Sequence, residues 1–338
     1  MGWNSEDIIA APLPLAHMSG LMTFLSCAQT GALFVLLERF DADTVLDTIE
    51  RHRCSLHVGF PAQYAALLDS YRSRSRNLGA LRLCLTGGDA CPIDLQEQVT
   101  SAFDAPLYNY WAATEVFGTL TFGPRPGQVT RITKDAQVRL VDENGDDVRD
   151  GEIGELLVRG PNLFAGYWND PQSTAESMKW GWYHTGDLMQ RGAADELIFV
   201  ARKKDIIIRG GTNISPVEVE QAIVAAHPLV EEAAVVGIPD AVLGQRVVGF
   251  VKLAKGAGKK VISEVIDNLA TRLAAYKVPE RLMELDAMPR NALSKIDRKA
   301  LQAMATNADR VHRSLAASSV SQAQRSDDRR SRRAAPGR

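Results

Sequence analysis

The sequence predicts an α/β protein that combines a large, mostly parallel sheet and its helices with a small antiparallel β subdomain and a smaller α+β C-terminal domain. In the first 111 residues, apolar runs of strand length alternate with helical patterns of about ten residues, which is typical of βαβ units. After residue 129 the runs are short and separated by turn residues, and after residue 203 helices and strands mix again.

The alternating part predicts the elements of the parallel sheet. We expect strands at residues 32–37, 55–58, 81–85 and 106–110, and helices at residues 42–51, 62–70 and 93–103. Ligands of such sheets bind beyond the carboxyl ends of the strands, so residues 86–89 and 112–115 are candidate ligand loops. The apolar stretch 21–37 is shorter than the ~20 residues of a membrane span. We therefore expect a buried helix and a strand there, and no transmembrane segment.

The later parts predict different elements. Strands at 137–141 and 154–158 flank the Asn-Gly turn of residues 142–145, a hairpin signal. Helices are expected at 218–226 and 262–273, and strands at 230–238 and 247–253. The predicted domains are residues 1–128 (the parallel-sheet part), 129–203 (the β subdomain), 204–304 (the mobile C-terminal domain) and 305–338 (a disordered basic tail).

Composition excludes several classes of protein. A formal net charge of −2 argues against a global role in nucleic-acid binding or at a membrane surface. The four cysteines lack metal-ligand spacing and are expected to be buried thiols of a reducing, cytoplasmic compartment. The six arginines of residues 321–338 predict a solvated tail, and a contact with nucleic acid or an acidic partner is the alternative.

Five stretches of the sequence suggest a nucleotide site. Asp187 follows a turn, where a carboxylate can accept two ribose hydroxyls. Thr114 and Glu115 offer a hydroxyl and a hard oxygen ligand, which suit phosphate and Mg²⁺. Residues 202–205 concentrate positive charge, and residues 210–213 can present backbone N–H groups to a ligand. Lys295 lies in a loop where its ammonium could meet developing negative charge.

Longer motifs follow one another along the chain, at residues 154–160 (GELLVRG), 166–171 (GYWNDP), 182–188 (WYHTGDL), 201–220 and 289–298. Their order and their residues resemble those of the adenylate-forming superfamily, the acyl-CoA synthetases and their relatives. The motifs are long and collinear, and the resemblance covers residues 7–303.

The resemblance implies a role for each matching residue. Asp187 holds the ribose and Arg202 reaches the same sugar, while Trp111 and the loop Gly87-Gly88-Asp89 flank the adenine. Thr114 contacts phosphate, and Glu115 ligates Mg²⁺. The remaining implied positions are His17 beside the acyl pocket, Lys204 at the hinge, Gly211 at the coenzyme A tunnel and Lys295 as the catalytic lysine of adenylation.

The implied activity is that of an ATP-dependent acid–thiol ligase. A carboxylic acid reacts with ATP to give an acyl-adenylate, and coenzyme A then gives the thioester. The acid itself stays unspecified, because the visible wall of His17, Phe24, Trp111 and Phe117 is apolar but unspecific.

The sequence also departs from the family. Sixteen residues precede His17, so we expect an N-terminally truncated chain that lacks the family's phosphate-binding loop and a part of the large domain. Adenylation by this chain alone is then expected to be impaired. The alternatives are a non-catalytic fragment or pseudoenzyme that binds AMP, an acyl ligand or a partner chain, and one half of a split enzyme. A complementing N-terminal half or a homo-oligomer would cover the apolar patch that we expect. The sequence has tryptophan at position 111, where members of the family commonly have tyrosine.

Overall fold

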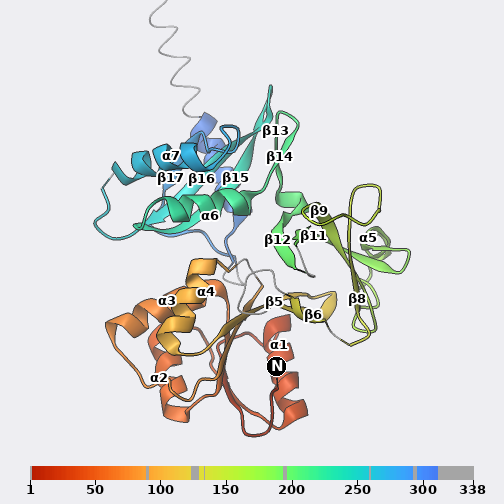
Figure 1. Cartoon of the computed structure of the whole chain (residues 1–338), viewed down its shortest axis with the longest axis vertical. Coiled ribbons are helices and arrows are strands. Elements are labelled where there is room, and N and C mark those ends of the chain that lie inside the picture. The colour runs from red at the N-terminus through yellow and green to blue at the C-terminus, as the bar shows by residue number, and fades with distance from the viewer. Residues whose placement is uncertain are drawn as a thin grey trace, which may run out of the picture. The chain divides into compact units, whose positions relative to one another are not determined.

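The computed structural model describes residues 2–88, 91–122, 129–132, 134–192, 196–258, 260–291 and 295–310 (Figure 1). The chain divides between Lys204 and Asp205 into two compact units. The first unit contains a seven-stranded sheet, called sheet A here, and a five-stranded sheet, called sheet B. The second unit contains one five-stranded sheet, sheet C.

Sheet A confirms the expected α/β architecture with a mostly parallel sheet. Its strand order is β2-β1-β3-β4-β5-β6-β7, with parallel pairing from β2 to β5 and antiparallel pairing from β5 to β7. The strands are β1 (Ile8–Ala11), β2 (Leu33–Leu36), β3 (Leu56–Gly59), β4 (Leu83–Gly87), β5 (Leu107–Ala113), β6 (Val116–Phe122) and β7 (Val129–Ile132). Strand β5 runs through Ala112 and Ala113, so the loop expected at residues 112–115 is shorter than predicted and begins at Thr114.

Four helices cover sheet A unevenly (Figure 1). They are α1 (Met18–Thr30), α2 (Ala42–His52), α3 (Pro61–Ser73) and α4 (Ile93–Phe103). Helices α2, α3 and α4 share one apolar cluster with the strands, whereas α1 contributes Cys27 to a separate cluster on the sheet. One face of sheet A therefore has three helices and the other has one.

The sequence correctly predicted a helix at the start of residues 21–37, but the prediction that this helix is buried is wrong. The buried residues of α1 are Ser19, Gly20, Thr23 and Cys27. Leu21, Phe24 and Leu25 are each more than 40% exposed. Gly20 explains the orientation, because a Cβ atom there would lie 2.2 Å from the carbonyl oxygen of Pro14. The helix packs closely through its small residues and turns its large apolar side chains outward.

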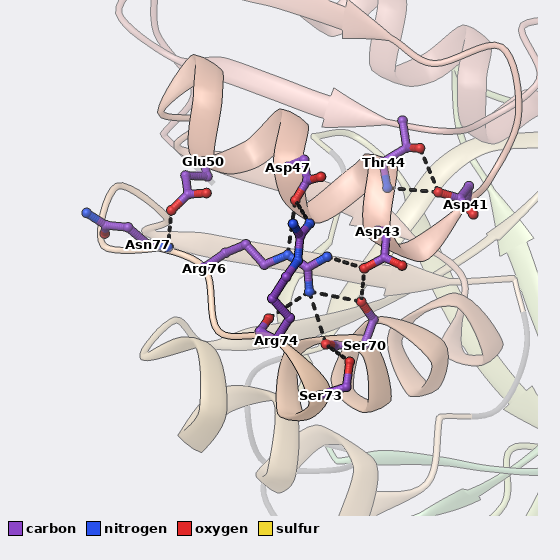
Figure 2. A network of polar contacts seen from close by, with 10 residues as sticks. All are labelled: Asp41, Asp43, Thr44, Asp47, Glu50, Ser70, Ser73, Arg74, Arg76 and Asn77. Carbon is purple, nitrogen blue, oxygen red and sulfur yellow. Dashed lines mark hydrogen bonds and ion pairs between the residues drawn. The ribbon is translucent and has the colours of Figure 1, made fainter.

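A polar network joins α2 and α3 to the segment after α3 (Figure 2). The guanidinium of Arg76 forms ion pairs with Asp43 and Asp47 and donates hydrogen bonds to the carbonyl oxygens of Ser70 and Arg74. The Arg76 side chain is 1% exposed, while that of Asp43 is 66% exposed. Buried arginine is tolerated here because its donors all meet acceptors.

Sheet B is antiparallel, as expected for the β subdomain. Its order is β10-β11-β9-β8, and β12 pairs with β11. The elements are β8 (Gln137–Val141), β9 (Ile153–Arg159), α5 (Pro171–Ser177), β10 (Met178–Lys179), β11 (Trp182–Arg191) and β12 (Leu197–Arg202). The Asn-Gly turn is present, because Gly145 has a positive φ of 88° and donates its N–H to the carbonyl oxygen of Asp142.

The second unit has the predicted α+β composition. Its sheet C has the order β14-β13-β16-β15, with β17 pairing in parallel to β16. The elements from the end of the first unit onward are the 3₁₀ turn Lys203–Asp205, β13 (Ile207–Arg209), β14 (Thr212–Ile214), α6 (Pro216–Ala226), β15 (Val230–Asp240), β16 (Gly244–Leu253), α7 (Lys260–Arg272), β17 (Arg281–Glu284) and the helix 298–310.

The prediction of a disordered basic tail from residue 305 onward is wrong for residues 305–310. Residues 305–310 continue the helix that begins at residue 298. Ala305 is buried in an apolar cluster, and the Asp309 carboxylate forms an ion pair of 2.6 Å with Arg246. Residues 311–338 lie outside the described part of the chain.

All four cysteines are buried, as expected, and no disulfide joins them. Burial raises the pKa of Cys84 to about 12. Across the described ranges, no helix is long and apolar enough to cross a membrane.

Candidate functional site

Asp187 lies in an irregular part of β11. The pairing of β11 with β9 shifts register between His184 and Leu188, and Gly186 has a positive φ of 69°. The backbone N–H of Asp187 donates to the hydroxyl of Thr185, which donates to the carbonyl oxygen of Leu156. This local interruption of the strand, which glycine permits, sets the position of the Asp187 carboxylate.

Two side chains from other strands hold that carboxylate. The indole Nε1–H of Trp111, on β5, donates a buried hydrogen bond of 2.7 Å to Oδ2 of Asp187. Nε of Arg202 lies 3.1 Å from Oδ1, and Arg202 is the register partner of Asp187 on β12. The Asp187 side chain is 6% exposed and that of Arg202 is 49% exposed. The structure thus brings together three of the residues that the sequence assigned to nucleotide binding.

Glu155 ties the same region to the end of β12 and was not assigned any role from the sequence. Its Oε1 accepts the N–H of Gly186 at 3.1 Å, and its Oε2 lies 3.1 Å from Nζ of Lys203. Nδ1 of His184 is 3.7 Å from the same Oε2. Glu155 stands in the GELLVRG motif, but its contacts join residues 31 and 48 positions away, which the sequence pattern does not specify.

Thr114 and Glu115 form the turn between β5 and β6. Thr114 is exposed. The phenol hydroxyl of Tyr167 donates to Oε1 of Glu115 at 2.7 Å. Burial and the negative charge of Glu115 raise the pKa of Tyr167. The sequence did not indicate Tyr167 as a partner of Glu115, because 52 residues separate the two.

The carboxylate of Glu115 suits an Mg²⁺ ion whose other ligands come mainly from the substrate. No cluster of three or more histidine, cysteine, aspartate or glutamate side chains that could hold a metal ion occurs within the described residues. Magnesium usually keeps several waters and is bound by one or two carboxylates together with substrate phosphates. The single carboxylate of Glu115 fits that mode of binding.

Strand β4 runs through Thr86 and Gly87, so the loop expected at residues 86–89 begins at Gly88. The backbone geometry accounts for both glycines of this segment. A Cβ atom on Gly87 would lie 2.7 Å from the carbonyl oxygen of Tyr110, so only glycine permits the close approach of β4 to Tyr110. Gly88 has a positive φ of 80°. Burial raises the pKa of Tyr110 to about 12. Asp89, the third residue of the predicted adenine loop, lies outside the described residues.

His17 caps the N-terminus of α1. Its Nδ1 lies 2.6 Å from the hydroxyl of Ser19 and accepts the backbone N–H of Ser19 at 3.3 Å. Its ring contacts that of Phe60 edge-on, with 6.0 Å between the ring centroids. These contacts fix the orientation of the imidazole, and the predicted role beside an acyl pocket stays a prediction.

A cleft of about 940 Å³ lies against sheet B. Its lining includes Glu155, Thr185, Gly186 and Lys203, together with the strongly exposed Trp168 and Trp180. Thr185 and Gly186 directly precede Asp187, so the cleft reaches the segment that positions the carboxylate. The sequence did not predict this cleft, because its walls come from five separate segments of the first unit.

In the second unit, Gly210 and Gly211 form the two-residue turn between β13 and β14. Their φ angles are +56° and +79°, so both positions favour glycine in a hairpin turn of this kind. The N–H of Gly210 donates to the carbonyl oxygen of Leu243. The turn is therefore explained by hairpin geometry, and the coenzyme A role of Gly211 stays a prediction.

Lys295 lies at the closing end of a short loop in the second unit. The backbone N–H of Asn291 donates to the carbonyl oxygen of Lys295 at 2.8 Å, and Arg290 pairs with Ile296 in an antiparallel bridge. Beyond the loop, the guanidinium of Arg298 donates to the carboxylate of Glu220 at 2.6 Å. Residues 292–294 lie outside the described residues. Lys204, the predicted hinge, is exposed and is the last residue of the first unit.

The chain combines a mostly parallel sheet and its helices with an antiparallel β subdomain and a separate α+β unit. Together with the carboxylate site at Asp187, this architecture is that of the adenylate-forming proteins. Comparison with known families agrees: the model of the AMP-binding enzymes matches residues 1–168, and that of the AMP-binding enzyme C-terminal domain matches residues 218–295. The chain belongs to the AMP-binding enzyme family.

Curated relatives are named as ligases. The chain is 36% identical over 300 residues to indoleacetate–CoA ligase of Aromatoleum aromaticum, which covers 87% of this chain and 58% of the relative. It is 34% identical over 315 residues to a medium/long-chain-fatty-acid–CoA ligase of Mycobacterium tuberculosis, which covers 89% of this chain and 55% of that protein. The chain thus spans between half and three fifths of the length of these relatives.

Solved structures show the same fold. An anthranilate CoA ligase in complex with anthranoyl-AMP matches with a TM-score of 0.84 and 28% identity, over 91% of this chain and 61% of that chain. ATP-bound MatB from Rhodopseudomonas palustris matches with a TM-score of 0.83 and 29% identity, over 90% and 61% of the two chains.

Proposed function

We propose that the protein is part of an ATP-dependent acyl-CoA ligase whose nucleotide site is built around Asp187. The observation that supports this most is the buried Asp187 carboxylate, held between Trp111 and Arg202, in a chain of the AMP-binding enzyme family. The two oxygens of an ionised carboxylate can accept hydrogen bonds from a pair of neighbouring hydroxyl groups. Two ribose hydroxyls are therefore suitable further donors.

The proposed chemistry has two steps. An oxygen of a carboxylic acid attacks the α-phosphorus of ATP, the bond to the β-phosphate oxygen breaks, and pyrophosphate leaves. The sulfur of coenzyme A then attacks the carbonyl carbon of the acyl-adenylate, loses its proton, and releases AMP. Positioning and cationic stabilisation supply most of the catalysis in phosphoryl-type transfer.

Each predicted residue has a place in this scheme. Asp187 accepts the ribose hydroxyls, and the exposed end of the Arg202 side chain contacts the sugar. Thr114 contacts the phosphate, and Glu115 holds Mg²⁺, which lowers the negative charge of the phosphates. Lys295 stabilises the charge that develops on the carboxylate and α-phosphate. Gly87, Gly88 and Asp89 flank the adenine, His17 lies beside the acyl group, Lys204 is the hinge and Gly211 lines the path of the thiol.

A second candidate function is favoured by the apolar surface of α1 and β2. Leu21, Phe24 and Leu25 of α1 are exposed, as are Leu33 and Leu36 of β2. Exposed apolar patches commonly mark interaction sites. In this alternative the chain binds AMP or an acyl ligand without completing adenylation, and a partner chain covers the patch. The two candidates differ in whether the chain by itself releases pyrophosphate.

The test is pyrophosphate release by the purified chain with ATP, Mg²⁺ and a panel of fatty, alicyclic and aromatic carboxylic acids. We expect release with one class of acid if the chain completes adenylation. A folded chain that binds AMP but releases no pyrophosphate would support the second candidate. A folded chain that neither binds AMP nor releases pyrophosphate would overturn both.

Lys295→Ala separates the two half-reactions. We expect it to lower pyrophosphate release by about 10²-fold, the usual effect of removing one group that stabilises the transition-state charge. Thioester formation from a supplied acyl-adenylate and coenzyme A should change by less than about threefold, because that step breaks no phosphoanhydride bond. Equal loss of both steps would contradict the role assigned to Lys295.

A further inference from the structure

The indole of Trp111 joins the two sheets of the first unit. Trp111 lies on β5 of sheet A, while its ring packs in an apolar cluster with residues of sheet B such as Leu156 and Tyr183. The side chain is 9% exposed. Its Nε1–H meets Oδ2 of Asp187 at 2.7 Å, and 76 residues separate the two. Little of the ring surface is therefore open to a base, and its polar atom is directed at the carboxylate.

The chemistry of this contact fixes the carboxylate. An indole N–H donates and cannot accept, so Asp187 must be the acceptor. Hydrogen bonds to ionised acceptors are shorter and about twice as strong as neutral ones. Close packing around the ring restricts its rotamer, and the restricted ring in turn restricts Oδ2. Arg202 approaches Oδ1 of the same carboxylate at 3.1 Å.

We propose that Trp111 is a positioning residue for ribose recognition: its indole N–H holds Asp187 in the orientation that accepts the sugar hydroxyls. The inference rests on the proposed nucleotide site and assigns Trp111 a role through Asp187, in place of stacking on the adenine. Groups that bind a ligand must be held within about 0.5 Å by neighbours whose own rotamers are locked. The buried indole meets this requirement at Oδ2, while Arg202 pairs with Oδ1.

Trp3 supplies a matched comparison within the same unit. Its ring packs partly buried against the other apolar cluster of sheet A. Its Nε1 is buried and has no hydrogen-bond partner among the described residues. Replacing Trp3 by phenylalanine therefore removes an indole N–H that holds nothing, while the same change at Trp111 removes one that holds Asp187.

The experiment measures Kd values for AMP and for 2′,3′-dideoxy-AMP with the wild-type chain and with Trp111→Phe, Trp3→Phe and Asp187→Asn. We expect Trp111→Phe to weaken AMP binding about tenfold, the effect of losing one charge-assisted hydrogen bond. Binding of the dideoxy nucleotide should change by less than about twofold. Trp3→Phe should leave both Kd values unchanged. In the Asp187→Asn background, Trp111→Phe should add at most a twofold change.

Other results of this experiment would contradict either the positioning role of Trp111 or the proposed function. Equal weakening of both nucleotides by Trp111→Phe would mean stacking or general packing, and it would overturn the positioning role while leaving the nucleotide site intact. Failure of the wild-type chain to bind AMP would overturn the proposed function and with it the ribose role. If Trp111→Phe does not fold, Trp111→Tyr keeps a hydrogen-bond donor at this position. Kd values within about twofold of the wild type for both nucleotides in that variant would support the proposal, whereas weakening of both nucleotides by the same larger factor would overturn it.

Discussion

Two arginine–aspartate clusters in the first unit have opposite patterns of burial. In the network between α2 and α3, the Arg76 side chain is 1% exposed and its partner Asp43 is 66% exposed (Figure 2). At the candidate site, the Asp187 side chain is 6% exposed and its partner Arg202 is 49% exposed. The first cluster buries the cation and the second buries the anion.

We interpret the first cluster as structural, and the proposed function makes the second a binding cluster. Arg76 directs its donors at carboxylates and backbone carbonyl oxygens of neighbouring elements, which fastens those elements together. The carboxylate of Asp187 accepts a hydrogen bond from the buried indole of Trp111 and forms an ion pair with the exposed Arg202. An exposed guanidinium can change partner at low cost, since exposed ion pairs contribute about 0–1 kcal/mol. The second arrangement can therefore admit a ligand, and the first cannot do so without losing contacts between helices.

The largest expected effect comes from Asp187→Asn. The substitution keeps the size of the side chain and an acceptor for Trp111, but it removes the charge that strengthens the ribose hydrogen bonds. We expect AMP affinity to fall about 100-fold, which corresponds to one to two charged hydrogen bonds, and the thermal shift caused by AMP to disappear. The matched control is Asp47→Asn, which alters an acidic partner of Arg76. An equal loss of affinity in both variants would remove the distinction between the clusters.

Arg76→Met tests the structural cluster. The substitution removes the ion pairs with Asp43 and Asp47 and the hydrogen bond to the carbonyl oxygen of Arg74, while the carbonyl oxygen of Ser70 keeps the backbone N–H of Arg74 as a donor. We expect a loss of about 2 kcal/mol in the free energy of unfolding, measured by urea denaturation. AMP affinity should stay within about twofold of the wild type. A variant of unchanged stability would show that the network does not hold α2 and α3 together.

A smaller effect is expected from Arg202→Gln. The pair with Asp187 is lost, but the arginine side chain is half exposed, so the free energy of unfolding should fall by less than about 1 kcal/mol. We expect AMP affinity to fall about tenfold, because the contact to the sugar disappears. Calorimetric titration measures the second quantity. If the free energy of unfolding falls by more than the free energy of AMP binding, Arg202 stabilises the fold and does not contact the ligand.

The smallest expected effect is the pH dependence of stability that comes from the Arg76 cluster, measured by acid titration. Hydrogen bonds from Arg76 lower the pKa of Asp43 below its ordinary value of 3.8, and those from Arg74 and Arg76 lower the pKa of Asp47. A lowered folded-state pKa means that the contribution to stability is present above pH 3.8 and is lost as the pH falls below that value. We expect the wild type to lose stability more steeply than Arg76→Met below pH 4. Parallel curves would mean that the ion pairs contribute nothing.

The sequence predicted most of the fold because the hydrophobic pattern is local. Helix α4 has the predicted bounds, Ile93–Phe103, and β8 has the predicted bounds, Gln137–Val141. The exposed face of α1 was not predicted, because the small residues that pack against Pro14 are no more apolar than those that face outward. Strand β1 (Ile8–Ala11) was not predicted.

The three residues that meet at Asp187 were each singled out from the sequence, but the contacts between them were not predicted. Asp187, Arg202 and Trp111 each stand in a motif, whereas the bond between Trp111 and Asp187 spans 76 residues. Glu155 and Tyr167 were missed as partners for the same reason, since their contacts depend on which strands lie side by side. Motifs indicate the chemical groups, and the sheet topology decides which of these groups meet.

The most direct test of the account is calorimetric titration of the 338-residue chain with AMP and with 2′,3′-dideoxy-AMP, beside the same titrations of Asp187→Asn. The account predicts that the wild type binds AMP at least about 30-fold more tightly than the dideoxy nucleotide and that Asp187→Asn binds both equally. Equal binding of both nucleotides by the wild type, or an unchanged preference in Asp187→Asn, would contradict the claim that Asp187 recognises the ribose.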